Sequence, residues 1–186
     1  MQSLTSPQFD DRLYRCVRAV YNTYRTELMN RNYYGNRLAA TRRASAALDI
    51  ALAVGTSSAI GAWALWRTSV GEIIWPVLSG VAALLAAVKP FLHLPAKTER
   101  YTSLFAGHGA VFHDLQAIVV EIERIGDYTK AISAKYNAVL ERAKALSPND
   151  DPCPRRRLLK RCYDEVNHQL PVTGFWWPPR GDSDVR

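Results

Sequence analysis

The chain has 186 residues, of which 48% are hydrophobic and 22% charged, and its formal net charge of +7 gives an isoelectric point near 9.5. This basic balance favours polyanionic partners such as anionic lipid or nucleotides. The three cysteines (Cys16, Cys153, Cys162) lie far apart without metal-ligand spacing. Their odd number, in a chain whose first residues form no apolar leader, is typical of a reducing compartment.

Residues 1–43 are expected to form an N-terminal cytoplasmic amphipathic helix. Ser6 and Pro7 suit its cap and first turn. One apolar stripe then follows with helical spacing: Phe9, Leu13, Val17, Val20, Tyr24 and Leu28. This helix is expected to continue almost unbroken into the next segment.

Residues 44–94 are predicted to form a transmembrane helical hairpin, with spans at 44–66 and 73–94. Asp49 is the only charged residue of the first segment and Lys89 the only one of the second. A spanning helix needs about 20 predominantly apolar residues, and it must satisfy its backbone polar groups internally. The alternative is a pair of alanine-rich core helices in a soluble bundle, because alanine is only weakly apolar.

The flanks of this hairpin predict its orientation. Trp63, Trp66 and Trp75 cluster near the short loop, as aromatic anchors do at a membrane interface. The opposite end is basic, with Arg31, Arg37, Arg42 and Arg43 before the first segment and Lys97 and Arg100 after the second. By the positive-inside rule both termini face the cytoplasm, so the sequence predicts a multi-pass protein of the bacterial inner membrane.

Residues 95–147 are expected to form one long cytoplasmic helix that opens at Pro95. Its apolar positions alternate in steps of four and three, which is a heptad seam. The seam comprises Leu104, His108, Val111, Leu115, Ile118, Ile122, Ile125, Thr129, Ile132, Tyr136, Val139, Ala143 and Leu146. The first helix is the expected partner in a coiled-coil-like stalk, and a seam of this length predicts a homo-oligomer, a tetramer or larger. Gly107 and Gly109 mark either a hinge or a point of close packing.

Residues 150–186 are expected to form a basic C-terminal helix followed by an irregular tail rich in tryptophan and proline. Five basic residues occupy the first turns of this helix: Arg155, Arg156, Arg157, Lys160 and Arg161. They could bind a nucleotide or oligonucleotide whose bases stack on Trp176, Trp177 or Phe175. They could equally attract an anionic lipid surface or be a solvated helix face.

Catalytic motifs are missing from the sequence. The four histidines have no zinc-protease or triad context, and there is neither a phosphate-binding glycine loop nor a G-x-S-x-G elbow. We therefore expect no enzymatic activity, no catalytic residue, no cofactor and no metal.

A polar stripe along residues 44–66 is the candidate lining of a pore. At 100° per residue Ser45, Asp49 and Thr56 fall on one helix face. A charged group inside a membrane is costly, so it usually faces a cavity or a partner. The alternative is that Asp49 pairs with Arg42 or Arg43 and takes no part in transport.

Two stretches resemble a known family. RNYYGNRLAATRRA precedes the hairpin and KTERYTSLFAGHGAVFHDLQAIVVEIE follows it. This order is similar to the SLATT family, the two-transmembrane effectors of bacterial conflict systems, over residues 8–146. The resemblance implies an oligomeric membrane pore that acts in anti-phage defence by abortive infection. Its gate would respond to a nucleotide or oligonucleotide made by a partner nucleotidyltransferase. The second hypothesis is a membrane-anchored helical scaffold or adaptor that docks a soluble partner through its stalk and basic tail.

Overall fold

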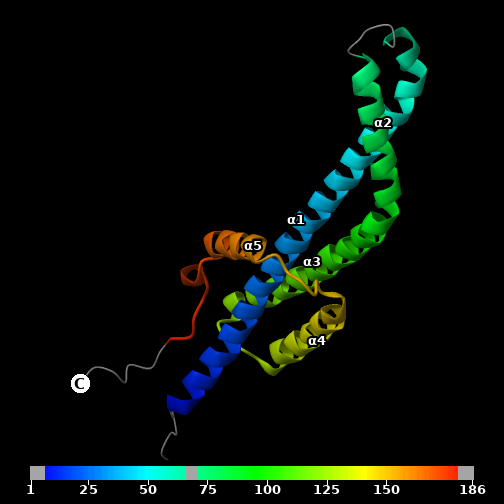
Figure 1. The fold of residues 1–186 in the computed structure, drawn as a ribbon. Coiled ribbons are helices and arrows are strands. Elements are labelled where there is room, and N and C mark those ends of the chain that lie inside the picture. The colour runs from blue at the N-terminus through cyan, green and yellow to red at the C-terminus, as the bar shows by residue number, and fades with distance from the viewer. Residues whose placement is uncertain (1–6, 66–70, 180–186) are drawn as a thin grey trace, which may run out of the picture. The chain divides into compact units, whose positions relative to one another are not determined.

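The computed structural model describes the backbone of residues 7–65 and 71–179, and the side chains of residues 11–53, 77 and 80–179. All regular structure within these ranges is helical, which confirms the predicted all-α class. The elements, shown in Figure 1, are α1 (Pro7–Leu65), α2 (Gly71–Val88), η1 (Lys89–Leu92), α3 (Leu94–Ile125), α4 (Lys130–Leu146), η2 (Ser147–Asn149), α5 (Arg156–Gln169) and η3 (Val172–Gly174). The predicted continuation of the first helix is also confirmed, since α1 is a single helix through Leu65.

The chain divides into two compact units. A core unit combines residues 1–35 with residues 103–186, and a hairpin unit comprises residues 36–102. The long helices α1 and α3 each contribute residues to both units.

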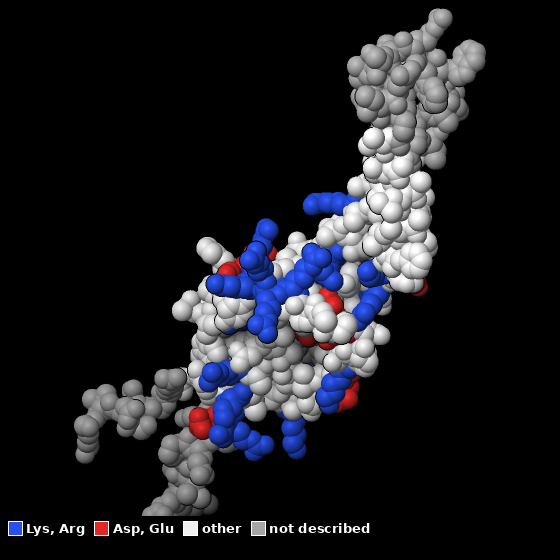
Figure 2. All heavy atoms as spheres, in the orientation of Figure 1, with Lys and Arg blue, Asp and Glu red and all other residues white. Residues whose placement is uncertain are grey.

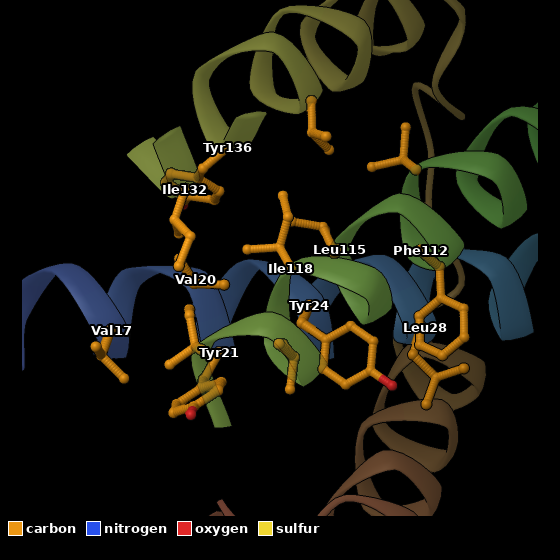
Figure 3. Close-up of a cluster of buried hydrophobic side chains, with 14 of the residues drawn as sticks. Val17, Val20, Tyr21, Tyr24, Leu28, Phe112, Leu115, Ile118, Ile132 and Tyr136 are labelled. Carbon is orange, nitrogen blue, oxygen red and sulfur yellow. The ribbon is translucent and has the colours of Figure 1, made fainter. Parts of the chain in front are cut away.

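One hydrophobic cluster organises the core unit, and α1 contributes its apolar stripe to it. Val17, Val20 and Tyr21 are almost completely inaccessible to solvent. Figure 3 shows these side chains together with those of α3 and α4. The other buried members are Tyr24 and Leu28 from α1, Val111, Phe112, Leu115, Ile118, Val119 and Ile122 from α3, Ile132, Tyr136 and Val139 from α4, and Val166 from α5. The predicted packing of the first helix against the heptad seam is therefore confirmed.

The single long helix predicted over residues 95–147 is wrong. The chain leaves α3 after Ile125 and turns at Gly126, whose φ of +68° lies in the left-handed region that disfavours other residues. Thr129 then caps α4, its side-chain oxygen accepting a hydrogen bond from the Ile132 amide at 3.3 Å. The heptad steps pass through this turn without a break, so one sequence pattern describes two separate helices.

Both helices of this pair lie against α1. The Tyr136 hydroxyl of α4 is 2.8 Å from the Thr23 hydroxyl and donates to the Ala19 carbonyl at 3.3 Å. Gly107 of α3 is a point of close packing rather than a hinge, because an added Cβ would lie 2.6 Å from a methyl carbon of Leu146. Most of the seam thus packs within one chain, while Ile125 is exposed.

The C-terminal tail is irregular, as predicted, apart from the short helix η3, but it is packed against α1. The ring of Phe175 stacks on that of Tyr21 with centroids 4.3 Å apart. The Tyr21 hydroxyl donates to the Trp176 carbonyl at 2.9 Å. Pro178 is buried as well, so the tail belongs to the core unit.

Polar contacts join α1 to η1 and to α3 in the hairpin unit. Lys89 Nζ lies 2.6 Å from Asp49 Oδ1, and about half of each side chain is exposed. Arg37 donates to the Tyr101 hydroxyl at 2.5 Å, and its guanidinium carbon lies 5.0 Å from the centroid of that ring.

An apolar stripe of the hairpin unit stays exposed along α2 and η1. Its residues follow one another in steps of four and three: Val77, Val81, Leu84, Val88 and Phe91, with exposed fractions between 41% and 78%. Exposed apolar residues at heptad spacing are typical of a helix face that receives another helix.

The predicted membrane hairpin needs correction. Among the described residues, no helix combines the length and the apolar character that crossing a bilayer requires. The prediction of a multi-pass protein of the bacterial inner membrane is therefore wrong. Serine, threonine and glycine interrupt the first segment, alanine supplies much of the rest, and each segment carries a charged residue that pairs with the other. The side chains of Thr56, Trp63, Trp66 and Trp75 lie outside the described residues.

We predict that Gly126→Ala lowers the free energy of unfolding by about 1 kcal/mol, because alanine is strained at positive φ. Gly80→Ala is the control. It lies inside α2 with open space around the added Cβ, and it should raise the free energy of unfolding by about 0.5 kcal/mol. Urea denaturation followed by circular dichroism measures both. If α3 and α4 were one continuous helix, Gly126→Ala would instead stabilise the protein, as Gly80→Ala does.

Candidate functional site

Helix α5 is held in the core unit by its apolar side. Cys162 and Val166 are buried one turn apart, and Leu158, Leu159 and Leu170 are half-buried around them. The opposite side of α5 faces solvent.

The basic residues predicted as a ligand site cluster at the start of α5. Arg155, Arg156, Arg157, Lys160 and Arg161 are all exposed. Figure 2 shows basic side chains gathered on the part of the surface where α5 lies in Figure 1. Arg157, Lys160 and Arg161 lie on the outer face of the helix. Acidic and polar residues lie beside them on this face: Asp164, Glu165, His168 and Gln169. We call the five basic residues the α5 basic cluster.

The position of the α5 basic cluster is electrostatically unfavourable. The N-terminus of a helix carries partial positive charge, and cations there typically cost about 0.3–1 kcal/mol each at exposed positions. The first turn contains no acidic residue, and Arg155 at the N-cap makes no side-chain cap. Within the described part of the chain, Arg161 alone of the five forms an ion pair, with Glu165 at 3.0 Å. A bound anion would relieve this repulsion.

The two tryptophans expected to stack on bases are used in internal packing instead. Trp177 lies 5.0 Å from the Tyr14 ring and 5.2 Å from the Tyr21 ring, measured between centroids, and its indole N–H donates to the Val172 carbonyl. Trp176 is half-buried against the hydrophobic cluster. The structure therefore gives no support to base stacking on these rings.

Of the three residues predicted to line a pore, the structure describes the side chains of Ser45 and Asp49. Asp49 pairs with Lys89 rather than with Arg42 or Arg43, and Ser45 is half-buried. The side chain of Thr56 lies outside the described residues.

Sequence reasoning missed a buried ion pair in the core unit. His108 is 3% exposed and Glu27 is 6% exposed, and His108 Nδ1 lies 2.7 Å from Glu27 Oε2. On the other side of the ring, Nε2 lies 3.5 Å from Asp150 Oδ1, a distance that suits an ion pair but makes no good hydrogen bond. Tyr34 stacks on the imidazole with centroids 5.2 Å apart. His108 within the apolar heptad seam was the available sequence signal, because a polar side chain at a buried position needs a partner.

Two neighbouring tyrosines extend this pair to the segment that leads into α5. Tyr34 donates to Asp150 Oδ1 at 2.7 Å and accepts from the Asp151 amide at 3.1 Å. Tyr33 donates to Asp151 Oδ2 at 3.0 Å and accepts from the Arg155 amide at 3.1 Å. We call Glu27, Tyr33, Tyr34, His108, Asp150 and Asp151 the tyrosine–histidine network.

Burial and charge shift two pKa values in this network. Burial lowers the pKa of His108, but the hydrogen bond and charge of Glu27 and the charge of Asp150 outweigh it, so the pKa is raised above its usual value. Burial also raises the pKa of Tyr34, with further contributions from Asp150, so its hydroxyl stays protonated and able to donate.

A metal site would need several liganding side chains close together. Among the described residues, no group of three or more histidine, cysteine, aspartate or glutamate side chains is arranged to hold a metal ion.

Comparison with known proteins found no matching family model, no matching curated protein and no matching solved structure. The resemblance to the SLATT family therefore stays a prediction.

We predict that Glu27→Gln lowers the free energy of unfolding by about 3 kcal/mol near pH 6, because it leaves a buried imidazolium without its anion. A raised pKa means that the pair is fully stabilising below the usual histidine pKa and is lost as pH rises through the pKa of folded His108. The effect of Glu27→Gln should therefore shrink at alkaline pH. Urea denaturation over a pH series measures it, and a pH-independent effect would contradict a charged pair.

Proposed function

We propose that this protein is a helical adaptor that binds a phosphate-bearing partner, an oligonucleotide in the first instance, on the α5 basic cluster. The observation that carries the proposal is the position of Arg155, Arg156, Arg157, Lys160 and Arg161 at the positive end of an exposed helix. This is the predicted scaffold function without its membrane anchor. The predicted pore depends on two membrane spans, which the described helices do not supply.

Two features of the structure support binding at this position. The helix is anchored by buried Cys162 and Val166, so its charges are presented on a folded element. The amide of Arg155 is held by Tyr33, so the start of the helix is positioned as well. A pre-positioned site loses less conformational freedom when it binds.

Recognition at this site would be electrostatic. Because the tryptophan rings pack internally, affinity should come from phosphate contacts and carry little base preference. The predicted partner nucleotidyltransferase and the predicted homo-oligomer stay predictions.

We predict that the double variant Arg156→Glu/Lys160→Glu lowers the affinity for a fluorescent single-stranded oligonucleotide by at least about tenfold at low salt. Glutamate near the N-terminus of a helix is favourable, so unfolding of α5 would not explain the loss. Fluorescence anisotropy measures the affinity. The wild-type salt dependence should have a slope of up to about −3.5 in log K against log salt, if all five basic residues contact phosphate.

The matched control is Lys130→Glu/Lys144→Glu, two exposed residues of α4. Both double variants change the net charge from +7 to +3, since each substitution replaces a positive with a negative charge. An equal loss of affinity in the two variants would show that overall charge, rather than the α5 basic cluster, binds the anion.

A further inference from the structure

The contacts around Tyr33 and Tyr34 fasten one short stretch of chain. Residues 150–155 connect η2 to α5, and the structure holds them through two carboxylates and two backbone amides. Every one of these bonds ends on a tyrosine hydroxyl of α1. The last of them reaches Arg155, the N-cap residue of α5 and the first member of the α5 basic cluster.

His108 lies at the centre of this arrangement. The titratable and charged groups that face its ring are Glu27 and Tyr34 from α1 and Asp150 from the segment after η2. The nearby Arg31 lies over the rings of Phe105 and Phe112, and α4 approaches this part of α3 with the apolar Leu146. The imidazole therefore lies between the two carboxylates and can attract both.

We propose that the tyrosine–histidine network is a pH-sensitive latch that positions the first turn of α5 and thereby regulates anion binding at the α5 basic cluster. The inference rests on the proposed function of that cluster. With His108 protonated, one cation balances Glu27 in the core and attracts Asp150 from the linking segment. With His108 neutral, Glu27 is a buried charge without a counter-ion and Asp150 loses its attraction to the ring.

When Asp150 is no longer attracted to the ring, the hydrogen bonds of Tyr33 and Tyr34 to Asp150 and Asp151 weaken as well. Tyr34 is hydrogen-bonded to the Asp150 carboxylate and to the Asp151 amide, and its ring stacks on that of His108. Tyr33 is bonded to Asp151 and to the Arg155 amide. Residues 150–155 consequently loosen as pH rises, and the N-terminal turn of α5 loses its fixed position.

Oligonucleotide affinity measured between about pH 6 and pH 9 tests the proposal. The oligonucleotide carries no terminal phosphate and contains only adenine and cytosine, so the ligand keeps a constant charge over this range. The wild-type Kd should rise at least about threefold as the competent conformation is depopulated. Asp150→Asn removes the charge that faces Nε2 and keeps an oxygen for Tyr34, so its Kd should change much less with pH. A wild-type Kd that does not vary with pH would overturn the latch.

Hydrogen exchange gives a second measurement that needs no ligand. After correction for intrinsic exchange rates, amides of residues 150–157 should lose protection at alkaline pH in the wild type and at all pH values in Tyr33→Phe. Tyr163→Phe, which removes an exposed hydroxyl of α5, is the matched control and should behave as the wild type. Unchanged protection in the wild type would overturn the latch. Failure to bind oligonucleotide at every pH, with protection changing as described, would instead refute the function proposed for α5.

Discussion

A histidine and a glutamate that are both almost inaccessible to solvent constrain the whole core unit. Glu27 and His108 are 81 positions apart in sequence, and their side chains meet at 2.7 Å. Two ionisable groups are tolerated in an apolar interior only when each finds its partner. The pair therefore allows essentially one register of α1 against α3, because sliding either helix by a turn would leave both groups buried and unpaired. The apolar cluster supplies attraction between the helices, and the ion pair selects their alignment.

This alignment also determines where α5 begins. Tyr33 and Tyr34 follow Glu27 on α1 by roughly two turns. Their hydroxyls form hydrogen bonds with carboxylates and amides of residues 150–155, the segment that leads into α5. The basic residues of α5 start where that segment ends. The basic surface proposed to bind phosphate is thus connected, through a short series of hydrogen bonds, to the buried pair of Glu27 and His108. Structure at the surface and charge in the core are coupled in a way that neither helix would show alone.

Local patterns predicted much of this fold, and they failed where the answer depended on contacts distant in sequence. Pro7 and the apolar stripe that follows predicted α1, and a basic C-terminal helix was predicted within residues 150–186, where α5 lies. The break after Ile125 was missed because Thr129 and Ile132 continue the heptad steps through the turn. Gly126 is typical of a helix C-terminus and Thr129 of a helix N-cap. These two residues indicate a break that the heptad periodicity alone does not reveal.

The candidate site shows the same division. The α5 basic cluster was predicted because its residues are adjacent in sequence. The tyrosine–histidine network was missed because its partners are 42 to 122 positions apart. The tryptophans were expected to be exposed, since nothing near them in sequence reveals that Tyr21, 155 residues away from Trp176, receives the tail. The membrane hairpin was inferred from two long apolar segments and from the tryptophans and basic residues that flank them. That inference treated Asp49 and Lys89 as separate charges rather than as a pair.

A double-mutant cycle on Glu27 and His108 tests the central claim most directly. The free energy of unfolding would be measured near pH 6 for the wild type, Glu27→Gln, His108→Gln and the variant that carries both. If the two side chains form a buried charged pair, the coupling energy should be about 2 kcal/mol or more. Additive effects of the two substitutions would contradict the pair, and with it the register of α1 against α3 on which the account of this protein depends.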